Sequence, residues 1–179
     1  MTEILCKNED ETRVFAKNLA GIIKRGDVIV LSGDLGAGKT KFVEGFLEHY
    51  NLQEEISSPT FTIVNEYHNP LIDIYHFDLY RVNDIYEFEN IGGEEYFERG
   101  ICIFEWGELI EDILPEDYLK ISFEKDEIND NIRKLILEPV GNKFSEVNFE
   151  EFIPRKRRLK ILFVKGWKNE SSSIRHIIY

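Results

Sequence analysis

The apolar residues near the start of the chain recur first at helical spacing and then form a continuous run. Large apolar side chains fall near a helical period between Asn8 and Lys24, which predicts an amphipathic helix. Asn8 is placed to cap this helix, with Glu11 three residues later as in a capping box. The run at 27–32 predicts a strand covered on both faces, as strands of parallel sheets are. A second helix with one apolar side is predicted at 39–50.

Shorter alternating or apolar runs predict the remaining elements. The expected strands lie at 60–67, 71–80, 100–104, 118–124 and 133–138. The first two are separated by a turn at 69–70, and the last two by a polar turn. Residues 84–97 predict a helix that is interrupted by a pair of glycines. The order of elements is therefore mixed α and β, with a strand–turn–helix unit near the start.

The composition fits one packed core. Of the 179 residues, 42% are hydrophobic and 13% aromatic, which argues against a disordered chain. No apolar run approaches the roughly 18 residues of a membrane span, and the first residues lack the basic-then-apolar order of a signal peptide. Cys6 and Cys102 form no disulfide framework and suggest two reduced core thiols. We therefore expect a cytoplasmic protein with no membrane partner.

The strongest motif follows the first predicted strand and matches the pattern G-x-x-x-x-G-K-[ST]. It consists of Gly33, Asp34, Leu35, Gly36, Ala37, Gly38, Lys39 and Thr40. Its glycines allow backbone angles that turn successive N–H groups inward, and the following helix adds its N-terminal dipole. Lys39 supplies a cation for the outer phosphates, and the Thr40 hydroxyl suits Mg²⁺. The sequence therefore predicts an α/β, P-loop NTPase-like sandwich, with a mixed, largely parallel sheet between helices, that binds a nucleoside triphosphate.

Two acidic residues are candidates to complete this site. Glu105 directly follows an apolar strand, which is the arrangement of a Walker B carboxylate. Asp78 lies near the end of its predicted strand, on the same face as His76. In open α/β sheets the ligand lies beyond the carboxyl ends of the strands, where both acids are expected. A solvated loop acid at Glu105 and a simple ion pair at Asp78 are the alternatives, and His76 is given no chemical role.

Three further features have more than one interpretation. Trp106 fits a core residue, or an aromatic that packs near the nucleotide or a partner. Arg133 stands in a predicted strand, where an exposed charge is the ordinary choice. The segment SSPTF at 57–61 fits either a loop that orders around the γ-phosphate or an ordinary turn.

The motifs GDLGAGKT, SPTF, HFDLYR and FEW occur in the order and rough spacing of the TsaE (YjeE) family. The resemblance covers residues 8–140. It implies an ATPase that works with TsaB and TsaD, the proteins that install the threonylcarbamoyl group on adenosine in tRNAs. A TsaE protein is not itself the transferase. Its ATP hydrolysis is weak alone and is thought to reset the partner complex between turnovers.

The resemblance also implies roles for single residues. The P-loop is similar to the phosphate site of the family, with Thr40 and Glu105 as magnesium ligands. Asp78 resembles the aspartate that the family needs for hydrolysis. Thr12 is similar to a position close to the nucleotide, and Trp106 and Arg133 also match family positions at the nucleotide site. The expected ligands are therefore ATP and Mg²⁺.

The net charge of −12 is divided unevenly along the chain. From residue 155 onward eight Lys and Arg residues face one acidic residue, which gives +7 and leaves −19 for residues 1–154. An acidic body repels a phosphate backbone, so we expect no strong direct nucleic-acid binding and tRNA only through the partner complex. We divide the chain into a P-loop ATPase domain at 1–140 and an extension at 141–179. The sequence leaves open whether this extension docks, adds an edge strand or is partly disordered.

Other functions were weighed against this one. A small-molecule or nucleoside kinase also pairs a P-loop with a compact sheet, but such kinases close an arginine-bearing lid, and only Arg81 and Arg99 occur between Thr40 and Gly100. A GTPase is disfavoured because the guanine motif Asn-Lys-x-Asp is missing from the sequence. A non-catalytic nucleotide sensor would not need the P-loop and both acids together. The kinase remains the alternative.

Overall fold

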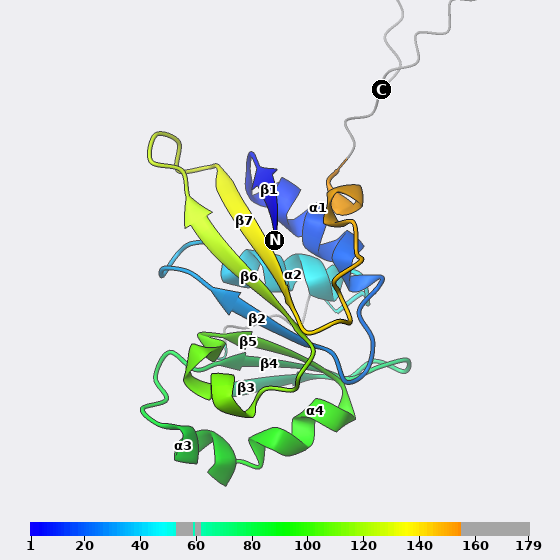
Figure 1. The fold of residues 1–179 in the computed structure, drawn as a ribbon, viewed down its shortest axis with the longest axis vertical. Helices are drawn as coiled ribbons and strands as arrows, with labels where there is room; N and C mark the ends of the chain where they lie inside the picture. Colours follow the sequence, from blue (N-terminus) through cyan, green and yellow to red (C-terminus); the bar gives the residue numbers. More distant parts are fainter. Residues whose placement is uncertain (53–58, 60–61, 155–179) are drawn as a thin grey trace, which may run out of the picture.

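The computed structural model describes residues 1–52, 59 and 62–154. These residues form a seven-stranded sheet in the order β1-β7-β6-β2-β5-β4-β3, with helices against both faces (Figure 1). The strands are β1 (Thr2–Cys6), β2 (Val28–Ser32), β3 (Val64–Tyr67), β4 (Ile74–Asp78), β5 (Ile101–Glu105), β6 (Tyr118–Lys125) and β7 (Arg133–Val140). The α-helices are α1 (Glu9–Ala20), α2 (Lys39–Glu48), α3 (Ile85–Asn90) and α4 (Tyr96–Arg99). Short 3₁₀ helices are η3 (Gly93–Glu95), η4 (Gly107–Ile113) and η5 (Phe149–Phe152).

The centre of the sheet is parallel and its outer pairs are antiparallel. β2 pairs in parallel with β5 on one side and β6 on the other, and β5 pairs in parallel with β4. The pairs β3–β4, β6–β7 and β1–β7 are antiparallel. Every residue of β2 is buried, as the apolar run at 27–32 predicts. The predicted sandwich with a mixed, largely parallel sheet is confirmed.

The first helix begins where the capping pattern predicts and ends early. The side chain of Asn8 accepts the N–H of Glu11 at 2.9 Å, and the Glu11 carboxylate accepts the N–H of Lys7 at 2.9 Å. The predicted end at Lys24 is wrong, because α1 stops at Ala20. The N–H of Lys24 bonds instead to the carboxylate of Asp27 at 2.8 Å, which draws the chain out of the helix toward β2. The second helix likewise stops at residue 48, before the predicted 50.

The sequence did not predict strand β1. It pairs along its whole length with β7, with Ile4 opposite Leu135. Ile4 and Cys6 are buried while Leu5 is exposed, which is the alternation of a half-buried edge strand. A terminal segment of five residues carries too short a pattern to be recognised without the strand that pairs with it.

The hairpin of β3 and β4 is shorter than predicted on both sides. The expected strand at 60–67 begins only at Val64, and residues 60 and 61 lie outside the described residues. Ile63 has a φ of 65°, in the left-handed region that interrupts extended backbone. β4 covers Ile74–Asp78 of the predicted 71–80. The helix predicted at 84–97 is interrupted at Gly92, as its paired glycines indicate.

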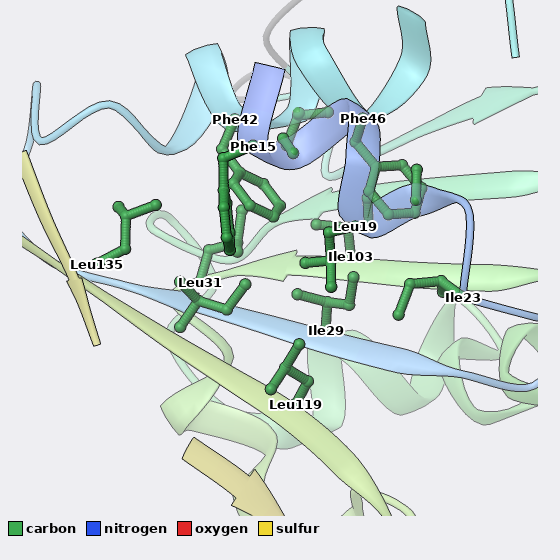
Figure 2. Close-up of a cluster of buried hydrophobic side chains, with 14 of the residues drawn as sticks. Phe15, Leu19, Ile23, Ile29, Leu31, Phe42, Phe46, Ile103, Leu119 and Leu135 are labelled. Carbon is green, nitrogen blue, oxygen red and sulfur yellow. The ribbon is translucent and has the colours of Figure 1, made fainter. Parts of the chain in front are cut away.

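The two faces of the sheet carry separate cores. α1 and α2 cover one face, and their apolar side chains point at β2 and β5 (Figure 2). The residues drawn there include Phe15, Leu19, Phe42, Phe46, Ile29, Leu31 and Ile103. The other face packs against α3, α4 and η4 through a cluster rich in aromatic residues. Because β2, β4 and β5 are covered on both faces, their ends are held in a fixed arrangement.

The described part of the C-terminal extension packs on the first core. Phe144 and Phe149 are buried there, and the Asn18 side chain of α1 donates to the Phe152 carbonyl at 2.9 Å. Residues 155–179, with the basic part of the extension, lie outside the described residues. The division at residue 140 stays a prediction. Over the described residues, no helix has the length and apolar character needed to cross a bilayer.

Candidate functional site

The glycine-rich loop leaves the carboxyl end of β2, the central parallel strand, and leads into α2 (Figure 1). Gly33 and Gly38 have φ values of 132° and 108°, which residues with a side chain rarely adopt. A Cβ at Gly33 would also come within 2.6 Å of the Phe123 carbonyl. Gly38 is the N-cap of α2, and no described side chain caps that helix. The amides at the start of α2 are therefore available to an anion.

Lys39 is held inside this loop. Its side chain is only 4% exposed, and its ammonium donates to the carbonyls of Gly33 at 2.6 Å and Asp34 at 3.1 Å. The ammonium also lies 4.3 Å from the centroid of the Trp106 ring. Burial lowers the pKa of Lys39, while Glu105 and other nearby carboxylates oppose that shift. A buried cation whose hydrogen bonds go to backbone carbonyls is suited to a polyanionic ligand.

The two predicted acids lie side by side next to the loop. Asp78 and Glu105 are register partners at the last positions of β4 and β5, and they are 7% and 6% exposed. One oxygen of Glu105, Oε1, accepts the Thr40 hydroxyl at 3.4 Å. Asp78 accepts the backbone N–H of Tyr80 at 3.0 Å. The structure thus brings the P-loop threonine and both predicted acids to one edge of the sheet.

The Arg133 side chain contacts the backbone of the P-loop. Its Nε donates to the Ala37 carbonyl at 2.8 Å. Lys125, its register partner across the β6–β7 hairpin, donates to the Leu35 carbonyl at 3.1 Å. Two cations from one hairpin therefore hold carbonyls of the loop.

Trp106 and Thr12 have different surroundings. Trp106 has a φ of 62°, and its ring packs against Tyr80, with 5.3 Å between centroids, as well as against Lys39. Thr12 is buried in α1, where its hydroxyl lies 3.5 Å from the Asn8 carbonyl. Glu9, one turn earlier, is the α1 residue that lines the cavity at the loop.

Two cavities flank the loop. One of about 240 Å³ is lined by Glu9, Leu35, Gly36, Gly38, Lys39, Thr40, Lys41 and Glu105. The other, of about 540 Å³, is lined by Ser32, Gly33, Asp34, Ala37, Ser122, Phe123, Glu124, Lys125 and Glu127. The described residues contain no group of three or more His, Cys, Asp or Glu side chains suited to hold a metal. Any metal here would need ligands from its substrate or from water.

Sequence reasoning missed three contributors to the site. His76 forms a hydrogen bond with Glu105 at 3.0 Å. Its position on the same strand face as Asp78 is the sequence pattern that could have indicated this contact. Glu108 accepts the hydroxyl of Ser32, and Lys125 contacts the loop. No sequence pattern marks Glu108 or Lys125 as part of the site, because each contact depends on tertiary packing. Of the segment 57–61, only Pro59 is described, so its role in the site stays open.

Comparisons with known proteins point to one family. The family model described as "Threonylcarbamoyl adenosine biosynthesis protein TsaE" matches residues 6–135. The tRNA threonylcarbamoyladenosine biosynthesis protein TsaE of Bacillus subtilis is 43% identical over 138 residues, which are 76% of this chain and 85% of that protein. The protein of the same name from Treponema pallidum is 39% identical over 117 residues, 65% of this chain and 86% of its own length. The crystal structure of YdiB from Bacillus subtilis aligns with a TM-score of 0.65 and 36% identity, covering 84% of this chain and 90% of that one.

Proposed function

Because the chain belongs to the TsaE family of proteins for threonylcarbamoyladenosine biosynthesis in tRNA, we propose that it is the Mg²⁺-dependent ATPase of that pathway. The observation that carries the proposal is the meeting of Lys39, Asp78 and Glu105 at the carboxyl edge of the parallel strands. A loop with uncapped amides and a buried lysine is suited to bind phosphates. Hydrolysis also requires a metal ligand and a group that orients water, and two adjacent acids can supply them.

The residues present fit a nucleotide with bound Mg²⁺. The uncapped amides of α2 and the Lys39 ammonium suit the phosphates, and the Thr40 hydroxyl with the Glu105 carboxylate would hold the metal. Mg²⁺ usually keeps several waters and phosphate oxygens as ligands, so two protein oxygens are enough. When bound, the metal supplies charge neutralisation to the phosphates.

The protein residues have separate tasks in this proposal. Lys39 exchanges its bonds to the Gly33 and Asp34 carbonyls for phosphate oxygens. Asp78, fixed by the Tyr80 amide, orients the attacking water or the metal. Trp106 covers one side of the lysine, and we propose that it borders the bound nucleotide. A place for the buried Thr12 near the nucleotide stays a prediction.

We expect slow turnover by the isolated chain, because two of its arginines, Arg99 and Arg133, are engaged elsewhere. Arg99 stacks over the rings of Tyr75 and Tyr96, which belong to the opposite face of the sheet from Asp78. Arg133 is engaged with loop carbonyls. Because neither residue acts as an arginine finger, the charge that develops on the phosphates is stabilised less than in fast P-loop enzymes. We propose that TsaB- and TsaD-like partners accelerate the reaction, and that tRNA is reached only through them.

The proposal is tested by measuring ATP hydrolysis by the chain with and without the TsaB and TsaD proteins. We expect weak turnover alone and clear stimulation by the pair. Rapid turnover that partners leave unchanged would contradict the scheme, and phosphate transfer to a small metabolite would favour a kinase. Lys39→Ala should abolish nucleotide binding, whereas the matched variant Lys17→Ala, on the exposed side of α1, should bind as the wild type does.

A further inference from the structure

His76 is a buried polar residue in the middle of a strand. It lies in β4 with no exposed surface, two residues before Asp78 on the same face. Its Nε2 lies 3.0 Å from Oε1 of Glu105, the oxygen that also accepts the Thr40 hydroxyl. Two donors on separate elements thus meet one oxygen of Glu105, and the second oxygen, Oε2, remains for a cation.

The surroundings of the other ring nitrogen, Nδ1, indicate the direction of the bond to Glu105. Among the described residues, no group forms a hydrogen bond to Nδ1, which is fully buried. A hydrogen at Nδ1 would be a buried donor without an acceptor. A hydrogen at Nε2, in contrast, has the Glu105 carboxylate as its acceptor. It follows that Nε2 donates the bond to Glu105.

We propose that His76 is a positioning residue, which fixes the Glu105 carboxylate for the metal through the Nε2–H donor. A carboxylate at the end of a strand can rotate about its side-chain bonds, and each hydrogen bond to it removes some of that freedom. Removing a residue that hydrogen-bonds to a metal ligand typically lowers metal affinity by about 10- to 100-fold. The metal's part in this inference rests on the proposed function, whereas the hydrogen bond from Nε2 to Glu105 does not.

The direction of this bond is tested by nitrogen-15 NMR of the imidazole in the full-length chain, with no nucleotide or metal added. We expect a hydrogen on Nε2 that couples to the Glu105 carboxylate, and loss of that coupling in Glu105→Ala. A bare Nε2, with the hydrogen on Nδ1, would overturn the inference. This measurement needs no ATPase activity.

The positioning role is tested with two variants of similar size. The amide nitrogen of Gln reaches about as far as Nε2 of histidine, whereas that of Asn reaches only as far as Nδ1. The affinity of a non-hydrolysable ATP analogue is measured with Mg²⁺ and with EDTA, in wild type, His76→Gln and His76→Asn. We expect the gain in affinity from Mg²⁺ to fall by about 10- to 100-fold in His76→Asn. His76→Gln should keep most of that gain, and affinity in EDTA should be equal in all three.

A purely structural role of His76 gives a different result. In that case both variants lower the unfolding midpoint, and neither changes the ratio of affinities with and without Mg²⁺, which would refute positioning. If the wild-type chain gains nothing from Mg²⁺, the proposed function fails, and the NMR result alone then supports or overturns the hydrogen bond from Nε2 to Glu105.

Discussion

The two faces of the β4–β5 pair differ in the chemistry of their side chains, although the same ten residues supply both. One face carries Tyr75, Phe77 and Phe104, which are buried among other aromatic rings. Phe77 and Phe104 stack with centroids 4.6 Å apart, and Phe88 and Tyr96 meet Phe77 edge-on. The opposite face begins with isoleucines and ends with His76, Asp78 and Glu105, all of them buried.

The difference shows how a small sheet separates stability from chemistry. Side chains alternate between faces, so neighbours in sequence such as Phe77 and Asp78 have unrelated surroundings. The aromatic face holds the two strands in one register, and that register places Asp78 beside Glu105. On these two strands the buried acids Asp78 and Glu105 lie at the carboxyl ends, where the P-loop and a bound ligand can pair with them.

The largest expected effect comes from breaking the aromatic face. Phe77→Ala should lower the free energy of unfolding by about 3–5 kcal/mol, because it removes a buried ring and leaves a cavity among three others. The measurement is urea unfolding. The control Tyr80→Ala removes a ring that is 56% exposed and should cost much less. If the folded Phe77→Ala protein also lost its nucleotide affinity, the separation of the two faces would be wrong.

The next effect comes from the polar face. Asp78→Ala should lower ATP hydrolysis by about 10²- to 10³-fold, since it removes the group that we propose orients the water. Nucleotide affinity should largely remain, because in the proposed site Lys39 and the loop amides hold the phosphates. Hydrolysis and binding are measured on the same preparation, with the exposed Asp112→Ala as the control. Equal losses of binding in Asp78→Ala and Lys39→Ala would show that this division of roles is incorrect.

A pH titration compares the two cores, since each holds one thiol. Burial raises the pKa of Cys6 from 9.0 to about 11 and that of Cys102 to about 12. The fold favours the protonated thiols, so their contribution to stability is complete below pH 9. It is lost as pH rises toward 11 and 12, by at most about 1.4 kcal/mol per pH unit for each thiol.

This loss is followed by urea unfolding between pH 8 and pH 10 in the wild type, Cys6→Ala and Cys102→Ala. Each variant should show a smaller decline of stability with pH than the wild type, because one thiol no longer titrates. A decline that neither substitution reduces would mean that other groups, such as tyrosines, cause it.

The smallest expected effect concerns the hairpin that contacts the P-loop. Arg133→Met should weaken nucleotide binding by about 2- to 10-fold, which corresponds to the loss of one hydrogen bond of typical net strength, to the Ala37 carbonyl. The control is Lys134→Met, the next residue, which pairs with Glu124 away from the loop. A loss as large as that of Lys39→Ala would indicate that Arg133 binds the nucleotide directly.

Local pattern predicted much of the site and most of the elements. The P-loop was recognised because its backbone turns and its lysine are encoded within eight consecutive residues. The buried strands at 28–32 and 101–105 and the cap at Asn8 were likewise visible in a few neighbouring positions. β1 and the early end of α1 were not, because β1 depends on β7, and the helix end depends on a side-chain bond to Asp27.

The sequence by itself determined that a glycine-rich loop with the P-loop pattern lies between a buried strand and a helix, and that two other strands end in acids. Only the tertiary structure decided that Asp78 stands beside Glu105, that His76 bonds to Glu105, and that Arg133 holds the loop. The physical reason is the separation along the chain between the residues in contact. Turns and caps are fixed by neighbours a few residues apart, whereas these contacts join residues that are distant in the chain and meet only because the whole sheet is packed on both faces.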